Sequence, residues 1–319
     1  MADQNAPEKH SIRLPALDVL RGLTLVAMVI FHFGWDLSFL GLGALGLADS
    51  PAWSAFGHAI AATFLTLVGV SLVLAHRGGV DSLKFLRRLG VVIAAALVVT
   101  IGTYIAMPDQ FIYFGILHAI ALGSVLALPF LRAPIVALIA AAGLVLALPV
   151  MLKGAVFTSR WLVWIGLGLE APPSTDFVPV FPWFGFILLG MALARVFDLS
   201  RLGTFGVQTA PGRTLALAGR HSLLVYLLHQ PILYGGLWLL AQAIAPPMDR
   251  ERTEFMSACT RECRANGGEA LRCANICSCA VENLKAEKLW SDVIANRVSD
   301  GLKTRMGEIS RTCAAKAAP

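Results

Sequence analysis

The sequence predicts an all-α protein: a polytopic integral membrane helix bundle of about seven spans, followed by a C-terminal cysteine-rich helical hairpin. Hydrophobic residues make up 57% and charged residues only 14% of the 319 residues, whereas soluble domains carry about 25% charged residues. All six cysteines lie between Cys259 and Cys313. We therefore divide the chain into a cytoplasmic tail (1–12), a transmembrane domain (13–246) and a periplasmic cysteine-rich helical module (247–319).

Seven apolar segments are long enough to cross a bilayer, which takes about 20 residues. A shorter apolar stretch, 159–169, carries Trp161 and Trp164. These aromatic residues favour an interfacial or re-entrant position for the stretch, and the count rises to eight if it spans. The seven predicted spans are 15–35, 54–75, 87–107, 111–131, 134–152, 181–197 and 217–245.

Basic residues between these segments set the expected orientation, because cytoplasmic loops are enriched in Lys and Arg. With the N-terminus in the cytoplasm, the inner loops hold eight basic residues and the outer loops hold two. Seven spans then place the C-terminal module outside, in the periplasm if the membrane is a bacterial inner membrane. The net charge of +6 reflects this topology, since the chain has no basic cluster with interleaved aromatic residues for nucleic acid. The inner basic residues are Arg77, Lys84, Arg87, Arg88, Arg132, Arg195, Arg201 and Arg213, and the outer ones are Lys153 and Arg160.

The cysteines are spaced for a stapled helical hairpin. Two pairs with three intervening residues flank the turn signal 266–268 (Asn-Gly-Gly), and residues four apart share a helix face. Two antiparallel helices could then join the inner pair and the outer pair, leaving two cysteines for a third bridge. Six cysteines allow 15 pairings, and a zinc site or free thiols are the alternatives. Disulfides agree with an external, oxidising location. The expected bridges are Cys263 with Cys273, Cys259 with Cys277, and Cys279 with Cys313.

The stretch 18–37, which includes most of the first predicted span, carries four ionisable groups, each costing about 2.5–3.5 kcal/mol at bilayer depth. His32 and Asp36 lie one helical turn apart, and a carboxylate beside an imidazole orients it as a general base. Arg21 lies near the cytoplasmic end, where its guanidinium suits phosphate and Asp18 is an expected ion-pair partner. The alternatives are an interfacial Asp18–Arg21 pair that snorkels, and a loop position for Asp36.

Four further histidines lie in or beside apolar segments: His58, His118, His221 and His229. Unpaired imidazole is unfavourable in hydrocarbon, so most should face the bundle interior or a water-filled cavity. For His118 and for His229, a role in packing and a role in a functional site are equally compatible with the sequence. The chain has no glycine-rich nucleotide loop, His-x3-His metal motif or nucleophile elbow.

"LDVLRGLTLVAMVIFHF" (17–33) resembles the first helix of transmembrane acyltransferases. One branch is the heparan-α-glucosaminide N-acetyltransferase family with its bacterial relatives, and the other is the bacterial membrane O-acyltransferase family. The pattern of Arg21-Gly22 followed by a helix-end histidine, here His32, is similar to the second branch. In animal enzymes of the first branch the position of His32 looks like an asparagine. Blocks similar to the bacterial relatives of the first branch are "FHFGWDL" (31–37), "FLTLVGVSL" (64–72), "FGILHAIAL" (114–122), "FPWFGFILLGMALAR" (181–195) and "GRHSLLVYLLHQPILYG" (219–235).

The resemblance covers about residues 13–240 and implies transfer of an acyl group, here acetyl, from cytoplasmic acetyl-CoA to a periplasmic sugar or amino-sugar acceptor, without a metal. It implies His32 as general base, Asp36 as its orienting group and His118 as a hydrogen-bonding group. Homodimerisation is compatible with it. The alternatives are a proton-coupled transporter or flippase, and a non-catalytic membrane subunit. The implied contacts are Arg21, Arg87 and Arg88 for the CoA phosphates, and Trp35, Trp183, Tyr226 and His229 for the acceptor.

Overall fold

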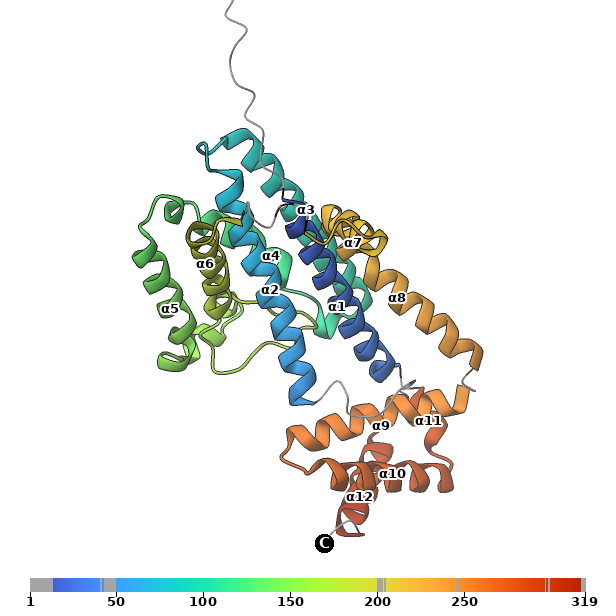
Figure 1. Cartoon of the computed structure of the whole chain (residues 1–319). Coiled ribbons are helices and arrows are strands. Elements are labelled where there is room, and N and C mark those ends of the chain that lie inside the picture. Colours follow the sequence, from blue (N-terminus) through green and yellow to red (C-terminus); the bar gives the residue numbers. More distant parts are fainter. Residues whose placement is uncertain are drawn as a thin grey trace, which may run out of the picture. The chain divides into compact units, whose positions relative to one another are not determined.

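The chain is all-α in the computed structural model (Figure 1). The structure describes residues 14–40, 42, 50–199, 203, 205–244, 247–295, 297 and 299–316. The predicted cytoplasmic tail, 1–12, lies outside the described residues. The α-helices within the described part are α1 (Pro15–Phe39), α2 (Pro51–Ala75), α3 (Ser82–Ala106), α4 (Ile116–Leu126), α5 (Ile135–Met151), α6 (Val180–Val196), α7 (Ala210–Arg220), α8 (Ser222–Ile244), α9 (Pro247–Ala265), α10 (Ala270–Ala286), α11 (Trp290–Ile294) and α12 (Asp300–Lys316).

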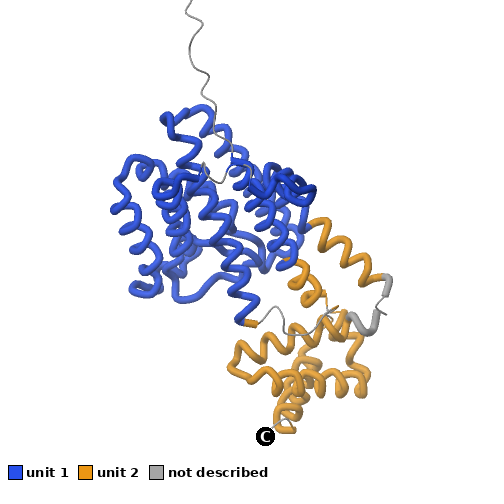
Figure 2. The backbone as a smooth tube through the Cα atoms, in the orientation of Figure 1, with its two compact units in different colours: residues 1–31, 51–230 blue, residues 32–50, 231–319 orange. Residues whose placement is uncertain are grey.

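The helices form two compact units (Figure 2). The first unit contains residues 1–31 and 51–230, and the second contains 32–50 and 231–319. Their boundaries therefore fall inside α1 and α8. Compactness does not measure which residues lie in a membrane, so the division at residue 246 remains a prediction.

Four of the described helices are long and apolar enough to cross a membrane: α1, α2, α3 and α8. Three predicted spans are shorter apolar helices, namely α4, α5 and α6. The 11 residues of α4 rise about 16 Å, roughly half of a bilayer's hydrocarbon core.

Two of the predicted spans are not single continuous α-helices, and the short apolar stretch is not α-helical. The predicted span 111–131 shortens to α4 because 3-10 turns at Pro108–Gln110 and Pro129–Leu131 flank it. The predicted span 217–245 is interrupted at His221, which ends α7. The stretch 159–169 has only turns and the 3-10 helix Val163–Ile165, as expected for a segment that does not span as an α-helix.

Two glycines bring α2 and α6 into backbone contact. A Cβ atom added at Gly69 would lie 2.0 Å from the Ile187 carbonyl oxygen, and one added at Gly190 would lie 2.0 Å from the Thr66 carbonyl oxygen. Small residues allow such close helix approach in membranes, where hydrophobic burial does not drive helices together. The buried side chains around this crossing include Leu65, Leu138, Ile187, Leu188 and Met191.

A second pair of glycines joins α1 to α7 in the same way. A Cβ atom at Gly22 would lie 2.2 Å from the Leu215 carbonyl oxygen, and one at Gly219 would lie 1.9 Å from the Asp18 carbonyl oxygen. The glycine of the Arg21-Gly22 pair is therefore required for packing.

Arg195, at the end of α6, holds the connection between α4 and α5. Its guanidinium donates to the carbonyl oxygens of Phe130 (2.7 Å), Leu131 (2.5 Å) and Ala133 (2.5 Å). These backbone acceptors follow the end of the short helix α4, and the Phe130 carbonyl also accepts from the Ala133 N–H at 3.2 Å. Arg195, which the sequence analysis used only as one of the basic residues that indicate orientation, thus has a structural role.

The C-terminal module confirms the predicted disulfide pairing: Cys259–Cys277, Cys263–Cys273 and Cys279–Cys313. All six cysteines are oxidised, so the zinc and free-thiol alternatives are not supported. A module this small can bury only a limited apolar core, and the three disulfide bridges offset this limit.

Arg305 of α12 closes the module near the C-terminal end of α10. It donates to both carboxylate oxygens of Glu287 at 2.7 and 2.6 Å, and to Glu308 at 2.5 Å. The hydrogen bonds from Arg305 hold the pKa of the Glu287 carboxyl below its usual value.

We predict that Gly190→Ala destabilises the protein, because its methyl group must displace the Thr66 backbone. Overpacking of this kind costs about 1–3 kcal/mol, and we expect a thermal-unfolding midpoint several degrees lower in detergent. Gly143→Ala is the matched control: it is also a helical glycine, but its added Cβ meets nothing within 4 Å. Equal midpoints for the two variants would contradict the close α2–α6 crossing.

Candidate functional site

A polar cluster lies at the N-terminus of α4, in the first unit. Asp176, from the loop before α6, accepts a hydrogen bond from the Ile116 backbone N–H at 2.9 Å through Oδ2. The Tyr226 hydroxyl of α8 lies 3.5 Å from the same oxygen, at the outer limit of hydrogen-bond distance. A Cβ atom at Gly115 would lie 2.4 Å from Oδ2, so the carboxylate fits only because residue 115 is glycine.

Two backbone hydrogen bonds position the loop that carries Asp176. The Thr175 N–H donates to the Gln110 carbonyl at 3.0 Å, and the Val178 N–H donates to the Phe114 carbonyl at 3.0 Å. The segment around Asp176 therefore runs beside the segment that leads into α4. Backbone pairing on both sides of the carboxyl fixes it against the helix N-terminus, whose partial positive charge favours a carboxylate.

His118, in the first turn of α4, has both ring nitrogens engaged. Its Nδ1 accepts from the Gly115 N–H at 3.2 Å, and its Nε2 lies 3.3 Å from Thr100 Oγ1. Because an amide can only donate, the neutral ring carries its proton on Nε2 and donates it to Thr100. The Thr100 hydroxyl donates in turn to the Ile112 carbonyl at 2.9 Å. In this arrangement His118 is a positioned donor, and its predicted catalytic role remains a prediction.

Asp176 keeps one oxygen accessible. The residue is partly exposed, and Oδ1 has no hydrogen-bond partner in the part of the chain that the structure describes. Burial raises the pKa of the Asp176 carboxyl above its usual value, and the Ile116 N–H and Tyr226 hydroxyl oppose that rise. The cluster can therefore bind a cation or a hydrogen-bond donor through Oδ1, or exchange a proton there.

A second polar group lies on α1, in the second unit. Asp36 is fully buried at 0% exposure, and His32, one helical turn before it, is half-buried. The alternative that Asp36 lies in an exposed loop is wrong. The Trp35 ring stacks on Phe39 with centroids 5.0 Å apart, and Phe39 lies 6.1 Å from the Tyr234 ring. One face of Trp35 is thus already covered, and its acceptor-binding role remains a prediction.

Arg21 forms the expected ion pair and also ties α1 to α2. Its guanidinium lies 2.7 Å from Asp18 Oδ1 and donates to Ser71 Oγ at 2.6 Å. The Ser71 hydroxyl donates to the Leu67 carbonyl at 2.5 Å. A buried ion pair needs such extra hydrogen bonds to offset its desolvation. Arg87 and Arg88 lie exposed on α3, and the contact of all three arginines with CoA phosphates remains a prediction.

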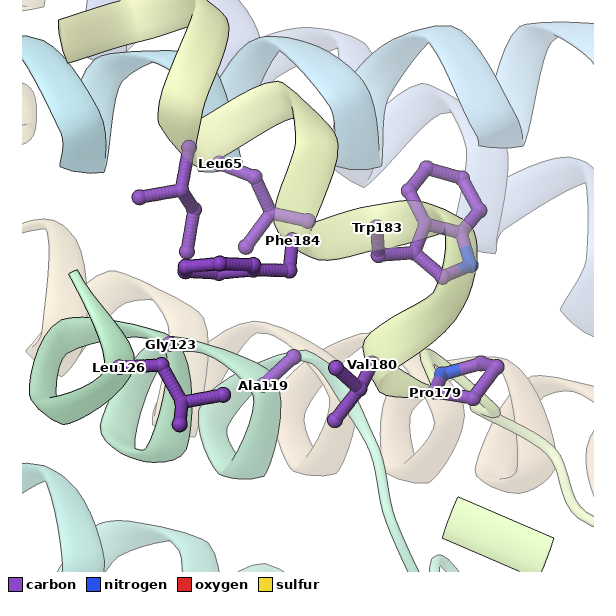
Figure 3. Close-up of a pocket in the computed structure, with 9 residues that line it drawn as sticks. Leu65, Ala119, Gly123, Leu126, Pro179, Val180, Trp183 and Phe184 are labelled. Carbon is purple, nitrogen blue, oxygen red and sulfur yellow. The ribbon is translucent and has the colours of Figure 1, made fainter. Parts of the chain in front are cut away.

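The remaining predicted acceptor residues lie in different surroundings. Trp183 is buried, 5.5 Å from the His58 ring, and lines an apolar cavity of about 10 Å³, room for about one water molecule (Figure 3). Tyr226 belongs to the Asp176 cluster. His229 Nδ1 lies 2.6 Å from the Tyr226 carbonyl oxygen, so in the neutral ring Nδ1 carries the proton.

Sequence reasoning missed Asp176. It weighed ionisable groups inside apolar segments, and Asp176 lies outside them in the loop "PPSTDF" (172–177). The available signal was a lone acidic residue a few positions before "FPWFGF" (181–186), the start of a block already singled out. In the described residues no group of three or more His, Cys, Asp or Glu side chains is placed to hold a metal.

The family model for the heparan-alpha-glucosaminide N-acetyltransferase catalytic domain matches residues 13–231. This match covers more than half of the chain. The chain belongs to that family. Members of the family use acetyl-CoA as the acetyl donor. By this membership the chain is a multi-pass membrane protein with an acetyltransferase domain. The match includes His32, Asp36 and the Asp176 cluster, and ends before the cysteine-rich module. No curated relative and no solved structure matches the chain.

We predict that Asp176→Asn reduces the pH dependence of stability. A carboxyl with a raised folded-state pKa is best tolerated when protonated, so it disfavours the folded state increasingly as pH rises from its unfolded-state pKa through its folded-state pKa. The thermal midpoint of the wild type should therefore decline more than that of Asp176→Asn as pH rises from about 4 towards neutrality. Parallel curves would contradict the raised pKa. Asp109→Asn, which changes an exposed carboxyl outside the cluster, is the control.

Proposed function

We propose that the protein transfers an acetyl group from cytoplasmic acetyl-CoA to an amino-sugar or other glycan acceptor at the periplasmic side of a bacterial inner membrane. The family match supports acetyl transfer. The observation that carries the residue assignment is the buried Asp36 one helical turn from His32, within the matched first helix. Such a pair provides an oriented base in a site shielded from water.

In the proposed reaction His32 removes a proton from the acceptor amine or hydroxyl as that atom attacks the thioester carbonyl carbon. The tetrahedral intermediate collapses, the C–S bond breaks and coenzyme A leaves as a thiolate. The imidazolium then returns the proton to sulfur, so the base is regenerated. Asp36 orients the ring and stabilises the imidazolium. A route through an acetyl-histidine intermediate uses the same residue as nucleophile.

Asp176, Tyr226 and His118 are proposed to position a substrate. The accessible Oδ1 of Asp176 offers an acceptor to an ammonium or hydroxyl group, while Oδ2 stays anchored by the α4 backbone. His118, held by Gly115 and Thr100, keeps the start of α4 in place. Trp35, Trp183 and His229 remain proposed acceptor contacts.

The proposed topology has seven spans: the four long helices, α5, α6 and the segment 111–131, in which α4 is continued by flanking residues. The N-terminus is cytoplasmic and the cysteine-rich module is periplasmic, which agrees with its three disulfides. Arg21, Arg87 and Arg88 then lie on the side from which CoA enters. The homodimer remains a prediction.

We predict that His32→Ala lowers acetyl transfer, or slow acetyl-CoA hydrolysis when no acceptor is supplied, by about 10²-fold or more, the range for loss of a general base. Acetyl-CoA binding should persist, measured on the purified protein in detergent. His76→Gln, which changes a histidine at the end of α2, is the control. Unchanged turnover in folded His32→Ala would exclude the base role. Absence of acetyl-CoA binding by the wild type would instead favour the transporter or subunit alternatives.

We predict that a membrane-impermeant maleimide labels the native cysteines of intact cells only after reduction. All six thiols are in disulfides, and the module is proposed to face the periplasm. Lys84→Cys is the matched control, since this exposed residue should label only after the inner membrane is permeabilised. The opposite pattern at the two sites would reverse the proposed orientation.

A further inference from the structure

The cysteine-rich module contains a groove that the acetyltransferase proposal does not use. Helices α9 and α12 pack chiefly on α10, the central helix of the module (Figure 1). An open groove of about 590 Å³ lies over α10. Its floor is the i, i+4, i+8 face of α10, and its walls come from α9 and α12. The main apolar lining residues are Phe255, Ile276, Ala280, Leu284, Met306 and Ile309.

Covalent bonds tie both walls of the groove to its floor. Two disulfides, Cys259–Cys277 and Cys263–Cys273, join α9 to α10, and Cys279–Cys313 joins α10 to α12. The groove is open to solvent, and its volume is within the usual range of about 300–1,000 Å³ for ligand sites. The bridges hold its walls in place.

One end of the groove is polar and carries an unpaired cation. Glu262, Asn266 and Arg272 line this end. The Glu262 carboxylate accepts from the Asn266 side chain at 3.2 Å. The Arg272 guanidinium has neither a hydrogen bond nor an ion pair to any residue that the structure describes. An apolar groove with arginine at one end is complementary to a long apolar chain that bears an anionic phosphate.

The module is tethered directly to a membrane-spanning helix. Helix α9 begins at Pro247, and α8, one of the candidate spans, ends at Ile244. A connection this short keeps the module at the membrane surface, where a tether raises the effective concentration of any ligand held in that surface. The ligand of this kind with the highest local concentration is then a lipid of this membrane.

We propose that this groove binds a single-chain anionic phospholipid, with its acyl chain along α10 and its phosphate at Arg272. The apolar lining supplies burial of the chain, at about 0.8 kcal/mol per methylene group in general transfer data. The guanidinium favours a head group of net negative charge over a zwitterionic one, in which an ammonium offsets the charge of the phosphate. The proposal is independent of acetyl transfer and assigns the module a lipid-binding role.

The test uses the full chain in nanodiscs of phosphatidylcholine and a photoactivatable lysophosphatidylglycerol probe, with crosslinked peptides mapped by mass spectrometry. We expect crosslinks on α10 and α12 of the module. Arg272→Gln should weaken capture about tenfold, and should weaken capture of a matching lysophosphatidylcholine probe less, because the choline ammonium offsets the charge of the phosphate. Arg261→Gln, another exposed arginine of the module that is outside the groove, is the matched control. Ser310→Trp, an exposed groove residue, should obstruct both probes.

Native disulfide pairing, mapped on non-reduced peptides by mass spectrometry, is the check that each variant is folded. Crosslinks confined to the membrane helices would overturn the proposal. It would also be overturned if folded Arg272→Gln and Arg261→Gln captured the anionic probe equally, or if folded Ser310→Trp captured both probes as the wild type does. Because acetyl-CoA turnover is measured separately, failure here leaves the proposed function intact.

Discussion

The close crossing of α2 and α6 is the constraint on which the first unit depends. Gly69 and Gly190 each face a carbonyl oxygen of the partner helix, so the two backbones meet without intervening side chains. Inside a membrane this contact relies on packing and weak polar interactions rather than on exclusion of water. The position of α6 sets the position of the loop before it, because Val180 begins α6 only four residues after Asp176. The geometry at the start of α4 therefore follows from a helix crossing formed by other residues.

The ionisable residues of α1 serve two purposes. Towards its start, Asp18 and Arg21 form a pair that reaches Ser71 and joins α1 to α2. Towards its end, Asp36 is buried one helical turn from His32. The charged residues at one end of α1 thus have a structural role that offsets their desolvation. Those at the other end are proposed to have a catalytic role.

Local spacing predicted much of this molecule. The i, i+4 spacing around a glycine turn predicted which cysteines pair, and the same spacing placed His32 and Asp36 on one face of α1. Asp176 escaped because its partner Ile116 is 60 residues away, and no local pattern records such a contact. The length of α4 escaped because hydropathy does not distinguish an apolar helix from apolar turns. The break at His221 likewise depends on the packing of α7 against α1 through Gly219.

All three disulfides have one end on α10, through Cys273, Cys277 and Cys279. This common attachment gives the module a mechanical property. Tension applied to α12 passes through Cys313 into α10, and from there into α9 through the other two bridges. The load bypasses the turn between α9 and α10 and the segment between α10 and α12. The module can therefore transmit a pull towards the last membrane helix without lengthening by the unravelling of those connections.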